Sequence, residues 1–410
     1  MNAMRSAVPA PAPLVARPAQ PGRRARFRQQ LQVPFAYDVV FTRDLFAETN
    51  EALAETLPAA ESPARLACFI DQGVLARWPD LPSRIAKWCE LRPASVQLVS
   101  APMAVPGGEE VKNDLTFVQR MTHQFQRFNL CRHSFVIAIG GGATLDAVGL
   151  ATAVFHRGLR LIRVPTTVLS QNDSGVGVKN GINLDGVKNL IGTFAPPYAV
   201  LNDALFLTQL EGRDWTAGLA EAFKVAIIKD AGFLTELEAL AERLVARDLD
   251  AMECVVQRCA LLHLDHIRAG GDPFETGSAR PLDFGHWSAH KLEAMTRHAL
   301  RHGEAVAIGV ALDLYCAEKL GFLTAVERDR VCSALERCGL SLWHAALAQR
   351  SAVSGALVIL QGLEEFRQHL GGRLSLTMPD GLGRTREIHE LPEALVEAGV
   401  AWLSARSAER

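Results

Sequence analysis

The sequence predicts an α/β domain with a mostly parallel sheet, followed by a mainly α-helical domain. Between about residues 31 and 204, short apolar runs rich in β-branched residues alternate with helical stretches. Beyond that point, over 205–410, strand signals become rare and long amphipathic stretches dominate. Alternation of the first kind is typical of a parallel sheet covered by helices. With 410 residues, of which 49% are hydrophobic, the chain is long enough to form two packed cores.

The expected elements follow in this order along the chain. Residues 1–30 are rich in Ala, Pro and Arg and contain no acid, so we expect a disordered tail rather than a targeting segment. Apolar runs predict strands over 66–71, 95–100, 135–142 and 159–167. Helices are expected over 114–129, 231–248 and 303–321.

The composition argues against several classes of protein. A net charge of −2 without a long basic block disfavours a protein held to nucleic acid by phosphate contacts. Eight scattered cysteines without a CxxC pair favour reduced thiols and a cytoplasmic location. No apolar run reaches the length of about 18 residues that a membrane-spanning helix needs, so no membrane partner is expected.

One glycine-rich turn is a candidate nucleotide site. The stretch "FVIAIGGGATLDAVGLATA" passes from an apolar strand through Gly140, Gly141 and Gly142 into a helix. Glycines let the backbone approach a diphosphate, whose charge the helix N-terminus favours. Three glycines at such a turn are also common without any ligand. Asp71, at the end of an earlier strand, offers a carboxylate to ribose hydroxyls.

A second unusual stretch is "VPTTVLSQNDSGVGVKNGINLDGVKNLIGTFAPP", residues 164–197. It places Asp173, Lys179, Lys188 and Asn189 among glycines, in a segment too polar for a plain core. Lysines beside flexible backbone suit a phosphorylated ligand. An exposed loop with solvated lysines explains the same pattern, and the sequence alone does not separate the two interpretations.

Three histidines and a Glu–Lys pair form the last group of candidates. His286 and His290 are four residues apart, a spacing that can hold a metal ion on a helix, and His302 follows closely. Glu221 and Lys224 share one face of an otherwise apolar helix. Structural histidines and an exposed salt bridge are the simpler interpretation. With Glu221 as a further ligand, the set would instead suit catalytic zinc.

Taken in order, these motifs resemble 3-dehydroquinate synthase and the wider sugar phosphate cyclase family. The resemblance covers roughly residues 65–380. It rests on six motifs, GGG-x₃-D, PTT-x₅-D-x₅-K, the "VKN" of 187–189, GLAE-x₂-K, GH-x₃-H and HGEAVAIG. The resemblance implies an N-terminal NAD-binding α/β domain over 31–204 and a helical metal and substrate domain over 205–410. It also implies a homodimer.

The resemblance also implies roles for single residues. It implies zinc, or cobalt in its place, on Glu221, His286 and His302, with His290 as a substrate-contacting or proton-handling neighbour. It implies NAD on Asp71, Glu109, Lys112, Gly140, Gly141, Gly142, Asp146, Thr166, Thr167 and Lys188. It implies a sugar phosphate on Asp173, Lys179, Asn189 and Lys224, with Arg157 contacting phosphate across the dimer.

The chemistry that the resemblance implies leaves no net redox change. NAD⁺ oxidises a ring alcohol, the ketone formed acidifies a neighbouring C–H bond, and phosphate is eliminated. NADH then returns the hydride, and an intramolecular aldol step closes a carbocycle. The expected enzyme is therefore a carbon–oxygen lyase acting on phosphates.

The sequence departs from the quinate-forming members at residues that hold the substrate carboxylate. Their arginine and asparagine correspond here to Ala279 and Asp283, with Arg280 displaced by one position, and an expected lysine corresponds to Asp265. Carboxylates at these places repel a carboxylate on the substrate. We therefore expect a neutral ketose phosphate similar to sedoheptulose 7-phosphate, bound near Asp283 and Arg280, as in the valiolone-forming branch.

Three alternatives stay open at this point. Arg280, His266, Arg268 or the segment 367–369 can replace the missing contacts, which would leave a 3-dehydroquinate synthase proper. A polyol dehydrogenase of the glycerol dehydrogenase type shares the two-domain plan, but does not need the phosphate-directed lysines. A non-catalytic sensor of NAD or sugar phosphate does not need an open Lewis acid.

Overall fold

The computed structural model describes residues 29, 31, 33–59, 62–185, 187–270, 274, 281–369 and 372–409. The chain divides into two units, Met1–Phe35 and Ala36–Arg410, and the account below concerns the second. The tail expected over 1–30 lies outside the described residues, apart from Gln29.

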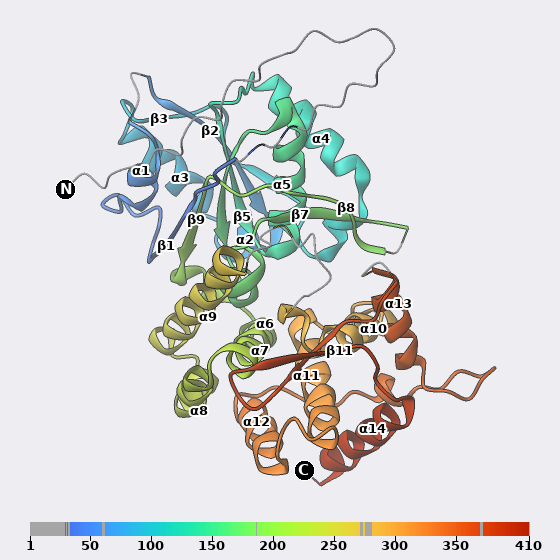
Figure 1. Cartoon of the computed structure of the whole chain (residues 1–410). Coiled ribbons are helices and arrows are strands. Elements are labelled where there is room, and N and C mark those ends of the chain that lie inside the picture. Colours follow the sequence, from blue (N-terminus) through green and yellow to red (C-terminus); the bar gives the residue numbers. More distant parts are fainter. Residues whose placement is uncertain are drawn as a thin grey trace, which may run out of the picture. The chain divides into compact units, whose positions relative to one another are not determined.

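A seven-stranded parallel sheet forms the centre of the first half of this unit (Figure 1). The strand order is β1-β9-β6-β5-β2-β3, and β4 also pairs with β2. The strands are β1 (Asp38–Thr42), β2 (Ala64–Asp71), β3 (Val96–Leu98), β4 (Met103–Val105), β5 (Phe135–Gly140), β6 (Arg160–Pro165) and β9 (Ala199–Asp203). The four predicted strands correspond to β2, β3, β5 and β6: β2 begins two residues earlier than predicted, and the other three are shorter by one or two residues at an end.

Helices cover both faces of this sheet. They are α1 (Ala52–Thr56), α2 (Gln72–Arg77), α3 (Leu81–Glu90), α4 (Leu115–Arg127) and α5 (Gly142–Val154). One apolar core joins the sheet to α1–α3, and a second joins it to α4 and α5, on the opposite side in Figure 1. Because both faces are covered, every residue of β5 is buried, which explains its uninterrupted apolar sequence.

A hairpin leaves the sheet domain between β6 and β9. It consists of β7 (Lys179–Leu184) and β8 (Val187–Phe194), which pair antiparallel. The polar stretch 164–197 thus contains a π-helical turn, η3 (Ser170–Ser174), followed by this hairpin. The sequence pattern did not predict the hairpin, because the buried part of β7 contains polar residues and glycine and β8 has no buried residue.

The second half is mainly helical, so the predicted fold class is confirmed. Its helices are α6 (Gly212–Ala217), α7 (Leu219–Lys229), α8 (Ala231–Val245), α9 (Leu249–Ala269), α10 (His286–Met295), α11 (His302–Lys319), α12 (Ala325–Arg337), α13 (Gln361–His369) and α14 (Glu393–Ala408). A short antiparallel pair, β10 (Leu376–Pro379) and β11 (Thr385–Ile388), packs with them. Among the described residues, no helix combines the length and the apolar character that crossing a membrane requires.

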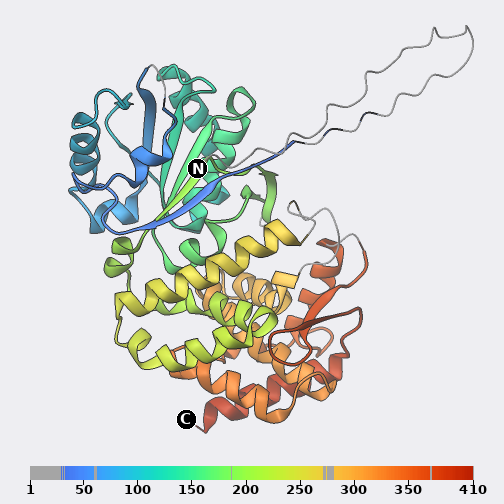
Figure 2. The same cartoon turned by 60° about the vertical axis from the view of Figure 1, so that its left-hand side comes forward.

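Helix α9 lies where the two halves meet, as the yellow helix shows in Figures 1 and 2. It contacts η3 of the sheet domain and also α7 and α8 of the helical half. The boundary predicted at 204/205 falls at the start of η4 (Ala204–Gln209), directly after β9. Residues on both sides of this junction therefore approach one another.

Candidate active site

The turn between β5 and α5 brings the backbone close to surrounding side chains. A Cβ atom on Gly140 would lie 2.9 Å from the Cβ of Thr144, and one on Gly142 would lie 2.7 Å from the Oγ of Ser174. No side chain caps the N-terminus of α5, so its first backbone N–H groups can face an anion. This arrangement is the one that a diphosphate-binding turn requires.

Asp71 and two threonines lie around this glycine turn. The carboxylate of Asp71 accepts hydrogen bonds from Thr144 Oγ1 at 2.6 Å and from the N–H of Gly73 at 2.7 Å. A carboxylate has further lone pairs, so these contacts leave room for a ribose hydroxyl. The N–H of Thr166 donates to the carbonyl of Gly140 at 3.0 Å, and a Cβ on Gly141 would lie 3.5 Å from Thr167 Cγ2.

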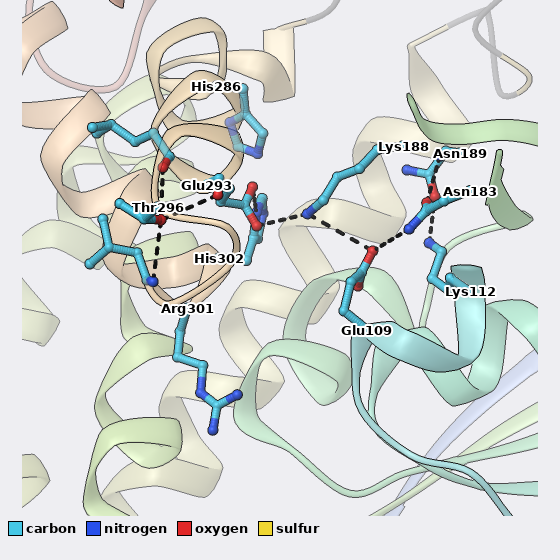
Figure 3. Close-up of polar contacts among 12 residues, drawn as sticks. Glu109, Lys112, Asn183, Lys188, Asn189, His286, Glu293, Thr296, Arg301 and His302 are labelled. Atoms are coloured by element: carbon cyan, nitrogen blue, oxygen red, sulfur yellow. Dashed lines mark hydrogen bonds and ion pairs between the residues drawn. The ribbon is translucent and has the colours of Figure 1, made fainter. Parts of the chain in front are cut away.

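A buried lysine connects α5 to the hairpin. Lys112 is 4% exposed, and its Nζ donates to Asp146 Oδ2 at 2.7 Å and to the side-chain oxygen of Asn189. Asn183 accepts from the N–H of Asn189 at 2.9 Å and donates to Glu109 Oε1 at 3.0 Å. Figure 3 shows Glu109, Lys112, Asn183 and Asn189 on its right-hand side. Four of the predicted NAD and substrate residues are therefore in one connected network.

Lys188 extends this network to the helical half. Its Nζ lies 2.7 Å from Glu293 Oε1 on α10 and 4.0 Å from Glu109 Oε1 (Figure 3). Glu293 is only 3% exposed, so this ion pair is largely shielded from solvent. Lys188 thus lies between the nucleotide side and the histidines.

Glu221, His286 and His302 bring three candidate metal ligands together. Their nearest ligand atoms all lie within 4.8 Å of one another. Oε1 of Glu221 is 3.6 Å from Nε2 of His286 and 3.5 Å from Nε2 of His302. The glutamate comes from α7, whereas each histidine is the first residue of its helix, α10 or α11. Three separate segments therefore meet at one point.

The other ring nitrogen of each histidine is held by the protein. His286 Nδ1 lies 3.1 Å from the carbonyl oxygen of Phe284, and His302 Nδ1 lies 3.1 Å from Glu293 Oε2. Such contacts fix the ring orientation and leave Nε2 as the ligand atom. The sequence analysis did not identify Glu293, although its position seven residues after His286 puts it on the same face of α10.

The donor set fits a divalent cation. Glu221 is fully buried, and neither of its carboxylate oxygens has a well-aligned hydrogen-bond donor among the described residues. Burial lowers the pKa of His302, but the carboxylates of Glu293 and Glu221 outweigh it and raise this pKa to about 10. Without a cation the cluster therefore holds a proton, which metal binding would displace. Two imidazoles and one carboxylate, with further positions open, are typical of catalytic zinc.

His290 lies beside this cluster but is not part of the closest set. Its ring centroid is 5.4 Å from that of His286 and 6.0 Å from that of His302. Its ligand atom groups instead with those of Glu293 and His302. The side chain is exposed, unlike the buried His286. A neighbour of the cluster that is open to solvent suits proton exchange better than a structural ligand role.

Lys224 lies against the same glutamate and within range of two further carboxylates. It is 2% exposed and forms an ion pair with Glu221 one turn earlier on α7. Burial lowers its pKa, but Glu221 and Asp173 outweigh this effect and, with Asp283, raise it. The ammonium therefore stays charged at neutral pH.

Asp173 has a partner that the sequence analysis missed. The Nδ1 of His263, on α9, lies 2.9 Å from Asp173 Oδ1. His266 follows His263 one turn later on α9, but the sequence around His263 is otherwise that of an ordinary long helix and indicated no role for it. The pair lies within electrostatic range of Glu221 and Lys224.

Three further predicted residues have exposed side chains or lie outside the described residues. Arg157 follows the C-terminal end of α5, about 20 Å along that helix from the glycine turn. Its φ of 65° places it in the left-handed region, and its side chain is exposed. Lys179 begins β7 with an exposed side chain. Arg280 and Ala279 lie outside the described residues.

The residues considered as replacements for the missing carboxylate contacts have partners of their own. Arg268 donates to Asp265 at 2.8 Å on the exposed end of α9, and His266 Nδ1 lies 3.2 Å from Lys229 Nζ. Arg367 donates to Glu364 at 2.6 Å.

Comparisons with known proteins all find 3-dehydroquinate synthases and related synthases. Models of the 3-dehydroquinate synthase N-terminal and C-terminal domains match residues 102–217 and 218–358. A 2-epi-5-epi-valiolone synthase of Streptomyces glaucescens is 34% identical over 306 residues, 74% of this chain and 76% of that protein. A 3-dehydroquinate synthase of Aliivibrio fischeri (strain MJ11) is also 34% identical, over 290 residues, 70% of this chain and 78% of that protein.

A solved structure extends the similarity over nearly the whole chain. ValA, a 2-epi-5-epi-valiolone synthase from Streptomyces hygroscopicus subsp. jinggangensis 5008, was solved with NAD⁺ and Zn²⁺ bound. It superposes with a TM-score of 0.81 at 28% identity, covering 93% of this chain and all of that one.

Proposed function

The chain belongs to the 3-dehydroquinate synthase family, and from that premise we propose that it is a sugar phosphate cyclase dependent on NAD and zinc. The resemblance that the motifs indicated is therefore confirmed at the level of the family. The proposed substrate is a neutral ketose 7-phosphate, and the product is a carbocycle formed with loss of phosphate. Relatives at 34% identity include both 2-epi-5-epi-valiolone synthase and 3-dehydroquinate synthase.

In this proposal the ion is held by Glu221, His286 and His302. Zn²⁺ supplies Lewis acidity, which makes a coordinated alcohol easier to deprotonate. Lys224 orients a substrate oxygen from the buried side, where its charge is maintained by the surrounding carboxylates. His290 exchanges a proton with the substrate or solvent from the exposed side.

We assign the dinucleotide to the glycine turn and its neighbours. The uncapped N-terminus of α5 faces the diphosphate, and Asp71 accepts from a ribose hydroxyl. Lys188 lies between Glu109 on this side and Glu293 beside the histidines, so it is placed to contact both nucleotide and sugar phosphate. Support comes from the solved 2-epi-5-epi-valiolone synthase, which contains NAD⁺ together with Zn²⁺.

One observation carries the choice of a neutral sugar. Asp283, which stands where the quinate-forming members have an asparagine, acts electrostatically on the buried ammonium of Lys224. A substrate carboxylate at this place would meet a like charge, and like charges brought together in a poorly solvated site repel strongly. A hydroxyl group in the same place meets acceptors for its hydrogen bond instead.

We further propose that the working form is a homodimer. Arg157 lies about a helix length away from the glycine turn of its own chain, and its side chain is exposed. A second copy can bring this guanidinium to a phosphate that the chain's own Arg157 does not reach.

A second candidate is 3-dehydroquinate synthase itself, favoured by the 34% identity to that enzyme of Aliivibrio fischeri. The two functions are separated by measuring kcat/KM on sedoheptulose 7-phosphate and on 3-deoxy-arabino-heptulosonate 7-phosphate, with NAD⁺ and Zn²⁺ present. We expect phosphate release from the first sugar only. Release from the second sugar alone would establish the second candidate.

The substitution Asp283→Asn tests the reason given for this preference. Removing the carboxylate lowers repulsion of a carboxylated substrate, so we expect measurable activity on 3-deoxy-arabino-heptulosonate 7-phosphate. The ratio of the two kcat/KM values should shift toward that sugar by at least about tenfold. Asp250→Asn, an exposed carboxylate near the start of α9 that has no place in the proposed substrate pocket, is the matched control and should leave the ratio unchanged. An unchanged ratio in Asp283→Asn would contradict the electrostatic argument.

A further inference from the structure

Arg163 is a fully buried cation that no part of the proposed function uses. It lies within strand β6, at 0% exposure, in the interior of the sheet domain. None of the ion pairs found among the described residues includes it. Burial lowers the pKa of Arg163. The carboxylate of Asp146 acts in the opposite direction but does not fully offset the effect of burial. Burying a charge in this way is costly unless its hydrogen bonds serve a purpose.

All four hydrogen bonds of its guanidinium go to one short segment. Nη1 donates to the carbonyls of Gly175 at 3.1 Å and Gly177 at 2.8 Å. Nη2 donates to the carbonyl of Lys179 at 2.7 Å and to Asn180 Oδ1 at 2.8 Å. The segment 175–180 joins η3, which carries Asp173, to β7, which begins at Lys179. The guanidinium therefore holds the backbone between two proposed substrate residues.

This segment needs an external clamp because its own sequence does not restrict it. It contains Gly175 and Gly177, and glycine loses more conformational freedom on ordering than any other residue. The planar guanidinium presents several donors in a fixed geometry, which suits four acceptors at once. An ammonium group has three donors on one atom and cannot span the same set.

The side chain of Asn180 fits only because α5 carries a glycine beside it. Asn180 is 4% exposed and donates to the carbonyl of Ala195 at 3.1 Å. A Cβ on Gly149 would lie 1.9 Å from Asn180 Oδ1, so any other residue there would displace the amide. Gly149 lies on the helix that begins at the glycine turn. Arg163, Asn180 and Gly149 thus form one packed unit beneath the segment.

We infer that Arg163 is a positioning residue that, together with Asn180, presets segment 175–180 for the phosphorylated sugar. The sugar is the one assigned under the proposed function, and the inference rests on that function for its kinetic consequence. Its structural consequence, an ordered segment in the absence of sugar, does not depend on it. Among the described residues, no hydrogen bond or ion pair joins either side chain to a proposed cofactor or metal residue, so we expect the main effect on the sugar.

Two measurements on the enzyme with NAD⁺ and Zn²⁺ test the inference. The variants are Arg163→Met and the milder Asn180→Ala, and the control is Arg160→Met, a half-buried arginine on the same strand. We expect amide hydrogen exchange of peptides covering 175–180 to rise by about tenfold or more in both variants. KM for sedoheptulose 7-phosphate should rise about tenfold, with Kd for NAD⁺ and zinc content unchanged. The control should change neither quantity.

A second pair of variants removes the concern that loss of Arg163 prevents folding. Gly149→Ala should raise exchange over 175–180 and KM, because the new Cβ displaces Asn180. The double variant Gly149→Ala, Asn180→Ala relieves that contact, so its effects should be no larger than those of Asn180→Ala alone. Additive effects in the double variant would contradict the proposed contact.

The failure of this inference is distinguishable from the failure of the proposed function. Unchanged exchange over 175–180 in Arg163→Met and Asn180→Ala overturns the inference, whatever the turnover. Increased exchange in an enzyme that releases phosphate from neither sugar supports the inference and overturns the proposed function. Increased exchange with an unchanged KM shows that the ordering has no role in sugar binding, and the inference then fails.

Discussion

Glu293 is the residue that joins the candidate metal site to Lys188, on the side where we propose that the nucleotide binds. One carboxylate oxygen accepts from His302 Nδ1 at 3.1 Å, and the other accepts from Lys188 Nζ at 2.7 Å. Burial raises the pKa of Glu293, yet His302 and Lys188 outweigh burial and hold this pKa well below its usual range. The side chain is therefore charged whenever the enzyme is folded, and it can orient the imidazole without a change of protonation.

Replacing Glu293 should weaken metal binding. In Glu293→Gln the acceptor for His302 Nδ1 loses its charge, so we expect the zinc affinity to fall about 10- to 100-fold. Competition with a chelator of known affinity measures this change. Glu365→Gln is the matched control, because Glu365, on α13, pairs with Lys291 of α10 at 2.5 Å and, among the described residues, forms no hydrogen bond or ion pair with a histidine. Equal affinities in the two variants would show that Glu293 does not support the metal site.

Among single residues, the sequence indicated the site residues that lie in contiguous motifs and did not indicate those that act through contacts between distant segments. Gly140, Lys224 and His302 lie in contiguous motifs, where neighbouring residue types restrict the interpretation. Glu293, His263 and Arg163 act through contacts between distant segments, so their local sequences look like an ordinary helix or strand. The spacing of His286 and His290 suggested a chelating pair, whereas in the structure the closest ligand atoms are those of Glu221, His286 and His302.

At the scale of elements, the candidate metal site depends on how closely α10 approaches α11. A Cβ on Gly309 of α11 would lie 2.1 Å from the carbonyl oxygen of Gly285, which precedes α10. Gly285 itself has φ 79°, a conformation that other residues adopt only with strain. The first residues of these two helices are His286 and His302, so this close packing determines the distance between them.

Gly309→Ala should therefore disturb both stability and metal binding. The added methyl group meets backbone and not a flexible side chain, so we expect unfolding to require about 1–3 kcal/mol less free energy. Zinc affinity should fall in the same variant, because α10 shifts relative to α11. Gly212→Ala is the control, since a Cβ there meets nothing within 4 Å. Denaturant titration of the metal-free proteins and chelator competition give the two quantities. A stable Gly309→Ala protein with normal zinc affinity would contradict this description.

Asp313 gives the same helix pair a dependence on pH. It accepts from the N–H of Gly285 at 3.0 Å and from Trp287 Nε1 at 2.8 Å, on either side of His286. Burial raises the pKa of Asp313 to about 7 despite these donors. A raised pKa means that the folded state binds the proton more tightly than the unfolded state does. The contribution to stability is therefore complete below about pH 4 and is lost as the pH rises through about 7.

The comparison with Asp313→Asn isolates this contribution, because asparagine does not titrate. The stability of the wild-type protein relative to the variant should decrease between pH 4 and pH 8, by at most about 4 kcal/mol. Urea unfolding of the metal-free proteins at several pH values measures it. A difference that stays constant, or grows, with pH would show that the carboxyl group titrates normally.

At the scale of the whole molecule, the proposed dimer predicts that each active site receives Arg157 from the other subunit. If Arg157 acts in the other subunit's site, Arg157→Ala and Lys224→Ala proteins are each inactive as homodimers. Hybrid dimers of the two contain one site with both residues intact. Mixing equal amounts under exchanging conditions should then restore about a quarter of wild-type activity, because half of the dimers are hybrids with one working site. If the activity does not recover although hybrid dimers have formed, Arg157 does not act in the other subunit's site.

The architecture was more predictable from the sequence than the arrangement of its parts. Buried parallel strands such as β5 are uninterrupted apolar runs, and long helices such as α8 show their periodicity, so the fold class was evident. The hairpin of β7 and β8 was not, because it packs against α5 and the short helix η1 (Glu109–Asn113), which are distant in the sequence. Local patterns also do not show that Lys188 on this hairpin reaches Glu293 on α10.

The central claim is that this chain eliminates phosphate from a neutral ketose 7-phosphate without net oxidation. The most direct test follows phosphate release and NADH absorbance together, with the zinc-loaded enzyme, NAD⁺ and sedoheptulose 7-phosphate. The account predicts one phosphate released per sugar consumed, no accumulation of NADH, and a carbocyclic product. NADH accumulating in step with sugar consumption while phosphate stays attached would contradict it, and would identify a polyol dehydrogenase instead.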